Sequence, residues 1–163
     1  MMTWEEICAD PLLAQWPFRV ESDQWGNAVL SPPPGFSHSS YQFEIGYQLR
    51  ALLPEGRTLS ECPIRTGAGV KATDVAWGSR KWLEKQPLTT GPCAVAPEIC
   101  VEVLSPSNTK AEIHAKFVLY FAKGAKECWS CDKKGGMKFF KRAERISRSE
   151  ICPAFPLKIS FAV

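Results

Sequence analysis

The stretch Pro97-Glu98-Ile99-Cys100-Val101-Glu102-Val103-Leu104-Ser105-Pro106-Ser107 decides the fold. From Glu98 to Leu104 the residues are mostly β-branched or apolar, which is typical of a strand covered on both faces, so we predict a central strand. By alternation, Glu102 shares a face with Cys100 and Leu104. A carboxylate inside a buried strand is costly unless a cation shares its site. Glu102 therefore indicates a functional site, unless it lies on an edge strand and faces water.

A helix is predicted directly after this strand. Thr109 and Glu112 have the spacing of a capping box, and Gly124 is a suitable stop after Lys123. Lys116 falls on the apolar stripe of this helix and not on the opposite face. The stripe consists of Ile113, Phe117, Tyr120 and Phe121. Lys116 either points toward the site of Glu102 or extends from the edge of the stripe into water, as lysines commonly do.

Two further acids are candidates upstream. Asp74 opens the segment Thr73-Asp74-Val75-Ala76-Trp77, which begins another predicted strand. Taken alone, Asp74 is simply a turn or strand-start aspartate. Glu44 lies beside the apolar stripe of a predicted helix from residue 39 or 40 to Leu53, and taken alone it is a solvated helix residue.

The conjunction of two carboxylates and a lysine indicates a divalent metal and phosphodiester cleavage. Mg²⁺ prefers oxygen ligands, so Asp74 and Glu102 together with a substrate phosphate would suffice to bind it. Lys116 would then orient the attacking water or stabilise the transition state. Glu44 would supply a third oxygen to the metal or to its water shell.

The remaining segments predict one α/β domain over residues 1–163. A short helix starts at Thr3, and strands near 18–21 and 28–30 form an N-terminal β-hairpin. A strand near 57–62 is followed by a turn at 66–72, and segments 127–131 and 137–141 form another hairpin. We expect a mixed central β-sheet flanked by the helices at 40–53 and 109–123.

Composition limits the class of protein. The 163 residues are 45% hydrophobic and 23% charged, as in ordinary folded domains. No apolar run approaches the ~20 residues of a membrane helix, so no membrane association is expected. The first residues lack the features of a signal peptide, so we expect a cytoplasmic protein whose seven cysteines are reduced. Cys128 and Cys131 form a CxxC, but on a strand they would point to opposite faces.

Charge and histidines give weaker signals. The net charge is only +3, but residues 123–148 hold nine lysines and arginines against three acids. This segment either meets phosphates or is a solvated hairpin. The chain has two histidines, His38 and His114, but no GxSxG sequence, so a serine hydrolase is not indicated.

The chain resembles a restriction-endonuclease-like family of bacterial domains of unknown function within the PD-(D/E)XK nuclease superfamily. The most specific similarity is the segment from Pro97 to Ser107, and the segment from Thr73 to Trp77 is similar to the family's Pro-Asp-x-x-Trp. The similarity spans nearly the whole chain. It also includes Arg19-Val20-Glu21 through Gly26 to Leu30-Ser31-Pro32-Pro33, Gly35-Phe36-Ser37-His38, the spacing of Lys116, Tyr120, Gly124 and Trp129, and Pro153-Ala154-Phe155.

The resemblance implies a restriction-endonuclease-like core and a DNA endonuclease that uses Mg²⁺ or Mn²⁺ bound by Asp74 and Glu102. Leu104 stands where the superfamily has a lysine, and the resemblance makes Lys116 its substitute on the following helix. Glu44 would correspond to the acid of the first helix. The alternative is a catalytically degenerate binding or interaction module on the same scaffold. A homodimer is a further expectation, with Phe139 and Phe140 as candidate contacts unless they pack in the core.

Overall fold

The computed structural model describes residues 2–15, 18–86, 91–105, 108–142 and 144–160. Its centre is a six-stranded mixed sheet in the order β3-β4-β5-β6-β7-β8. All neighbours are antiparallel except β5 and β6, which are parallel. The strands are β3 (Arg57–Thr66), β4 (Gly69–Gly78), β5 (Ile99–Val103), β6 (Glu127–Cys131), β7 (Met137–Lys141) and β8 (Glu144–Ile146).

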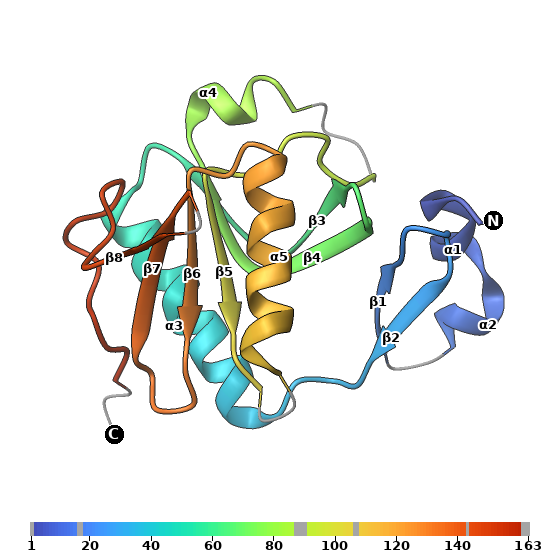
Figure 1. Ribbon diagram of the computed structural model, residues 1–163, viewed down its shortest axis with the longest axis horizontal. Coiled ribbons are helices and arrows are strands. Elements are labelled where there is room, and N and C mark those ends of the chain that lie inside the picture. Colours follow the sequence, from blue (N-terminus) through green and yellow to red (C-terminus); the bar gives the residue numbers. More distant parts are fainter. Residues whose placement is uncertain (1, 16–17, 87–90, 106–107, 143, 161–163) are drawn as a thin grey trace.

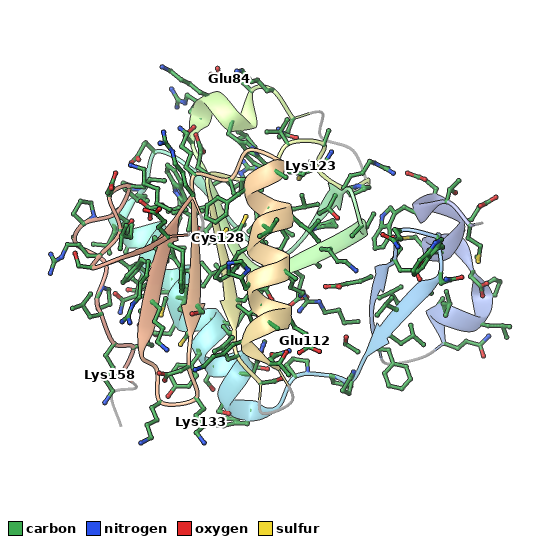
Figure 2. All side chains as sticks on the ribbon, in the orientation of Figure 1. Glu84, Glu112, Lys123, Cys128, Lys133 and Lys158 are labelled. Carbon is green, nitrogen blue, oxygen red and sulfur yellow. The ribbon has the colours of Figure 1, made fainter. Side chains whose placement is uncertain are left out.

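Helix α5 (Lys110–Ala122) makes the crossover that the parallel pair β5–β6 requires. Its first turn has the predicted capping box of Thr109 and Glu112, and Gly124 follows with a φ of 101°. Figure 2 shows Glu112 and Lys123 at opposite ends of this helix. The helix therefore runs back across the sheet from the end of β5 to the beginning of β6.

Two helices cover the two faces of the sheet. Helix α3 (Phe36–Leu52) lies behind the sheet and α5 in front of it in Figure 1. The core on the α3 side includes Tyr41, Ile45, Leu49, Val75, Val101, Trp129 and Phe139. The core on the α5 side includes Ala76, Cys100, Ile113, Phe117, Tyr120 and Cys128. This arrangement confirms the predicted restriction-endonuclease-like α/β fold with a mixed sheet between helices.

The N-terminal part packs at the side of the sheet. Helices α1 (Trp4–Ala9) and α2 (Pro11–Ala14) precede the hairpin of β1 (Arg19–Ser22) and β2 (Ala28–Ser31). Figure 1 shows this hairpin beside β4. Hydrogen bonds from Val70 N–H to Ser22 Oγ (2.8 Å) and from Lys71 Nζ to Ser22 O (3.0 Å) attach it there. Strand β1 can thereby contribute side chains to the region around β4.

Several details differ from the sequence predictions. Residues 69–72 are paired with 63–66, so the predicted turn at 66–72 is too long. Strand β8 is not predicted from the sequence, whereas the segment 78–92, for which an exposed loop or a short helix is expected, contains the short helix α4 (Arg80–Leu83). Phe139 is buried in the core, which makes it unsuitable as a dimer contact, whereas Phe140 is partly buried. Pro106 and Ser107 of the signature segment lie outside the described residues.

The cysteines behave as the alternation predicts. Cys128 belongs to the core on the α5 side and Cys131 to the core on the α3 side, so the CxxC sulfurs point to opposite faces. Among the described helices, none is long and apolar enough to cross a bilayer.

Candidate active site

Asp74 occupies the place where strand β4 separates from β5. The pairing of the two strands runs from Trp77↔Ile99 to Val75↔Val101 and stops there. The Asp74 side chain then replaces the missing backbone partner, because Val103 N–H donates to its Oδ2 at 2.7 Å. Asp74 points to the same face as Ala76, toward α5, and is only 2% exposed. A buried carboxylate thus stands at the end of a strand ladder.

Two basic side chains hold the Asp74 carboxylate. Arg19 Nη1 on β1 lies 2.5 Å from Oδ1, and its guanidinium also contacts Glu61 and donates to the Ala72 carbonyl. His38 Nε2 lies 3.4 Å from Oδ2. Burial raises the pKa of Asp74, but the hydrogen bond from His38, the charge of Arg19 and the Val103 N–H outweigh it, so the net shift is downward. Asp74 is therefore held as a carboxylate.

Glu102 lies on β5 and is held from α5. Tyr120 donates its hydroxyl to Oε1 at 2.7 Å, and Lys116 Nζ lies 3.1 Å from Oε2. Burial raises the pKa of Glu102 to about 7, and the nearby charge of Asp74 adds to this, while Lys116 and Tyr120 oppose it. The structure thus places Glu102 in the buried position predicted from its strand.

Glu21 of β1 joins the two halves of the site. Lys116 Nζ lies 3.2 Å from Glu21 Oε1, and Arg19 Nη2 lies 3.6 Å from the same oxygen. An unbroken chain of ionic contacts therefore runs from Asp74 through Arg19, Glu21 and Lys116 to Glu102. Burial lowers the pKa of Lys116, but the charges of Glu102 and Glu21 outweigh it and raise the pKa above its ordinary value. The ammonium stays charged between two carboxylates.

Glu44 is not part of this chain of contacts. It lies on α3, where Gln48 Nε2 donates to its Oε1 at 3.0 Å. Helix α3 packs on the face that carries Val75 and Val101, whereas Glu102 points to the opposite face. Among the described residues, no hydrogen bond or ion pair joins Glu44 to Asp74, Glu102 or Lys116.

Four residues of the site were not assigned to it from the sequence: Arg19, Glu21, His38 and Tyr120. Arg19 and Glu21 alternate on β1 and so share a face, which is the only local signal of a paired charge. His38 belongs to the first turn of α3, and its Nδ1 is buried without a hydrogen-bond partner in the part of the chain that the structure describes. Tyr120 belongs to the apolar stripe of α5, which predicts a core position for its ring but not the contact of its hydroxyl with Glu102.

The donor set fits a hard divalent cation. Within the described ranges, no cluster of three or more histidine, cysteine or acidic side chains has the arrangement of a preformed metal site. The carboxylates of Asp74, Glu102 and Glu21 nevertheless supply only oxygen ligands, which Mg²⁺ and Mn²⁺ accept. The mutual repulsion of Asp74 and Glu102 is the kind of charge imbalance that a cation relieves.

Comparison with known proteins identifies the family of this chain. The family Uma2, described as "Putative restriction endonuclease", matches residues 11–152. The chain belongs to this family. The match covers β1, Asp74, Glu102 and Lys116, and it confirms the restriction-endonuclease-like resemblance. No curated protein matches the chain.

A solved structure has a similar fold. It is described as a "putative nuclease belonging to DUF820" from Anabaena variabilis ATCC 29413. The TM-score is 0.74 at 16% identity, over 97% of this chain and 95% of that chain. Family and fold together support a nuclease, and restriction-endonuclease-like nucleases generally use divalent metals.

Proposed function

We propose that this Uma2 protein is a metal-dependent endonuclease that hydrolyses DNA phosphodiester bonds, with Asp74 and Glu102 as the ligands of Mg²⁺ or Mn²⁺. The observation that carries the proposal is the convergence of two buried carboxylates, Asp74 where the pairing of β4 with β5 ends and Glu102 near the end of β5, with the ammonium of Lys116. Such groups are expensive to bury, so their convergence needs a functional reason.

The residues of the chain have separate roles in this proposal. A bound divalent cation would polarise the scissile phosphate and acidify an attacking water. Lys116 donates hydrogen bonds to the charge that develops on the phosphoryl oxygens. Tyr120 and Val103 N–H fix one oxygen each of Glu102 and Asp74. Arg19 and His38 keep Asp74 ionised.

Hydrolysis tests this assignment. Supercoiled plasmid DNA is incubated with the protein and Mg²⁺ or Mn²⁺, alongside Asp74→Asn and Glu102→Gln, which remove a charge but keep the shape. We expect nicking that both substitutions lower by about 100-fold or more. Glu84→Gln removes an exposed carboxylate from the end of α4 (Figure 2) and serves as the matched control. Cleavage that survives both site substitutions would refute the proposal.

The second candidate is a binding module with a degenerate site. The observation in its favour is that Arg19 and Lys116 already neutralise the two carboxylates without a metal. Calorimetric titration with Mn²⁺ separates the candidates, because the degenerate module would give no heat that depends on Asp74 and Glu102. A single domain over 1–163, a cytoplasmic location and a homodimer stay predictions.

A further inference from the structure

The outer face of α3 and the first half of β3 form two adjoining hollows, which we call the α3–β3 surface. The first, of about 390 Å³, is lined by Phe43, Tyr47 and Gly46 of α3 and by Thr58 and Ser60 of β3. The second, of about 410 Å³, is lined by Arg50, Arg57 and Arg80 together with Glu55 and Thr58. Because Thr58 lines both, the two hollows are neighbours.

The first hollow presents aromatic rings to solvent. Phe43 and Tyr47 lie one helical turn apart and are 74% and 63% exposed. Gly46 has no side chain to fill the hollow beside these rings; a Cβ at this position would lie in the hollow, 3.7 Å from Thr58 Cγ2 and 3.9 Å from Val75 Cγ1. Exposed rings that flank a hollow are suited to stacking on the flat face of an unpaired nucleobase.

The second hollow is cationic. Its lining includes three arginines, Arg50, Arg57 and Arg80, and one acidic residue, Glu55. Arg50 Nη1 donates to the Pro54 carbonyl at 2.9 Å, which fixes the guanidinium over the end of α3 and leaves further N–H groups on the same fork. The planar fork of arginine matches the oxygens of a phosphate. The charge of this hollow is therefore complementary to a phosphodiester backbone.

Aromatic rings and guanidinium groups thus occur side by side on the α3–β3 surface, with Thr58 between them.

We propose that the α3–β3 surface binds a single-stranded segment of nucleic acid, with an unpaired base stacked on Phe43 and Tyr47 and the adjacent phosphates at Arg50, Arg57 and Arg80. Duplex DNA fits less well, because its bases are already stacked inside the helix and cannot reach the rings. A second copy of this chain would satisfy the apolar rings but would bring a second set of arginines against the first.

The surface is linked to the candidate active site through Gln42. This residue lines the first hollow, and its Nε2 donates to the Asp74 carbonyl at 3.0 Å and to Glu61 Oε1 at 2.7 Å. A strand on the α3–β3 surface therefore lies next to the segment that holds Asp74. That this strand belongs to the DNA being cut rests on the proposed function, whereas the binding itself does not.

Fluorescence anisotropy tests the binding in EDTA, where no metal-dependent cleavage occurs. The full chain is titrated into labelled oligothymidylate and, separately, into a labelled duplex of equal length. The variants are Phe43→Ala, Tyr47→Ala and Arg57→Ala. The matched controls are Phe36→Ala, which removes a ring that is 90% exposed on the same helix outside the hollow, and Arg145→Ala on β8.

We expect the single strand to bind more tightly than the duplex, and each aromatic variant to weaken it by about 5-fold to 100-fold. Arg57→Ala should lower the slope of log affinity against log salt by about 0.7. Equal losses in the two controls would overturn the proposal, as would a preference for the duplex. Sedimentation that shows a dimer broken by Phe43→Ala and Tyr47→Ala, with unchanged DNA affinity, would assign the surface to a second copy instead. Asp74→Asn is expected to abolish hydrolysis and to leave binding in this assay unchanged, so failure of one proposal is distinguishable from failure of the other.

Discussion

Replacement of Arg19 by methionine tests how the site is held together without a metal. Arg19 joins β1 to Asp74, Glu61 and the Ala72 carbonyl, so the variant leaves the Asp74 carboxylate buried and without its closest cation. Loss of one partner of a buried ion pair costs about 3–5 kcal/mol. Asp74 keeps the Val103 N–H at 2.7 Å and His38 at 3.4 Å, and Arg19 is 22% exposed, so we expect a loss at or just below the lower limit of that range, about 2–3 kcal/mol.

Urea unfolding followed by far-ultraviolet circular dichroism gives the magnitude. The free energy of unfolding is compared in EDTA for the wild type, Arg19→Met and Arg65→Met. Arg65 pairs with Glu5 at 3.5 Å, and the two side chains are 52% and 66% exposed, so its replacement should cost about 0–1 kcal/mol.

Addition of Mg²⁺ should then stabilise Arg19→Met more than the wild type, because the cation replaces the lost positive charge beside Asp74. The reasoning fails if Arg19→Met is as stable as Arg65→Met in EDTA. It also fails if Mg²⁺ raises the free energy of unfolding equally in the variant and the wild type, since Arg19 would then not share its place with the cation.

Three further outcomes are expected. Tyr120→Phe removes the donor to Glu102 Oε1 and should lower the free energy of unfolding by about 1.5–3 kcal/mol in a urea titration, whereas Tyr47→Phe on the surface should leave it unchanged. Lys116→Met should lower plasmid cleavage by about 100-fold. Leu104→Lys added to this variant should recover about 10-fold of the activity, because position 104 lies on the same side of the sheet as Glu102. An absence of recovery would contradict this geometry. The hydrogen bond from Cys62 lowers the pKa of Cys93 to about 7, although burial opposes this shift. The rate at which iodoacetamide alkylates Cys93, measured by mass spectrometry, should therefore stop rising above about pH 8. Cys8 is the internal control: burial raises its pKa, so its rate of alkylation should continue to rise at pH values where that of Cys93 is constant.

The sheet and its crossover helix could be predicted because their signals are local. The apolar run around Glu102 identifies β5 by itself, and Thr109 with Glu112 fixes the first turn of α5 within four residues. Strand β8, with only three residues and an exposed pattern, has no such signal, since its pairing with β7 and not its own sequence defines it. The length of β4 was underestimated for the same reason, because residues 69–72 are strand only through their partners on β3.

The charged part of the site could be predicted only in part. Lys116 was found because a cation on an apolar helical stripe breaks a local pattern. Arg19 has no local anomaly, and its contact with Asp74 joins positions 55 residues apart. His38 lies in the first turn of α3, which any polar residue could occupy. It gains a carboxylate partner only because α3 packs against β4, where Asp74 lies. The distances along the chain, and not the residue types, hid these two groups.

The position of the lysine follows from the geometry of α5. Lys116 and Tyr120 are four residues apart, so they lie on one face of the helix and reach the two oxygens of Glu102 from the same side. A lysine at position 104, directly after β5, would reach the same space, because Leu104 packs on the side of the sheet to which Glu102 points. Leu104 instead packs with the apolar residues beneath α5, which helps to hold the helix at the distance where Lys116 can contact both Glu102 and Glu21. Helix α5, which connects the parallel strands β5 and β6, therefore also supplies the cation Lys116. Position 104, where a lysine is absent, is instead part of the core that holds the helix in place.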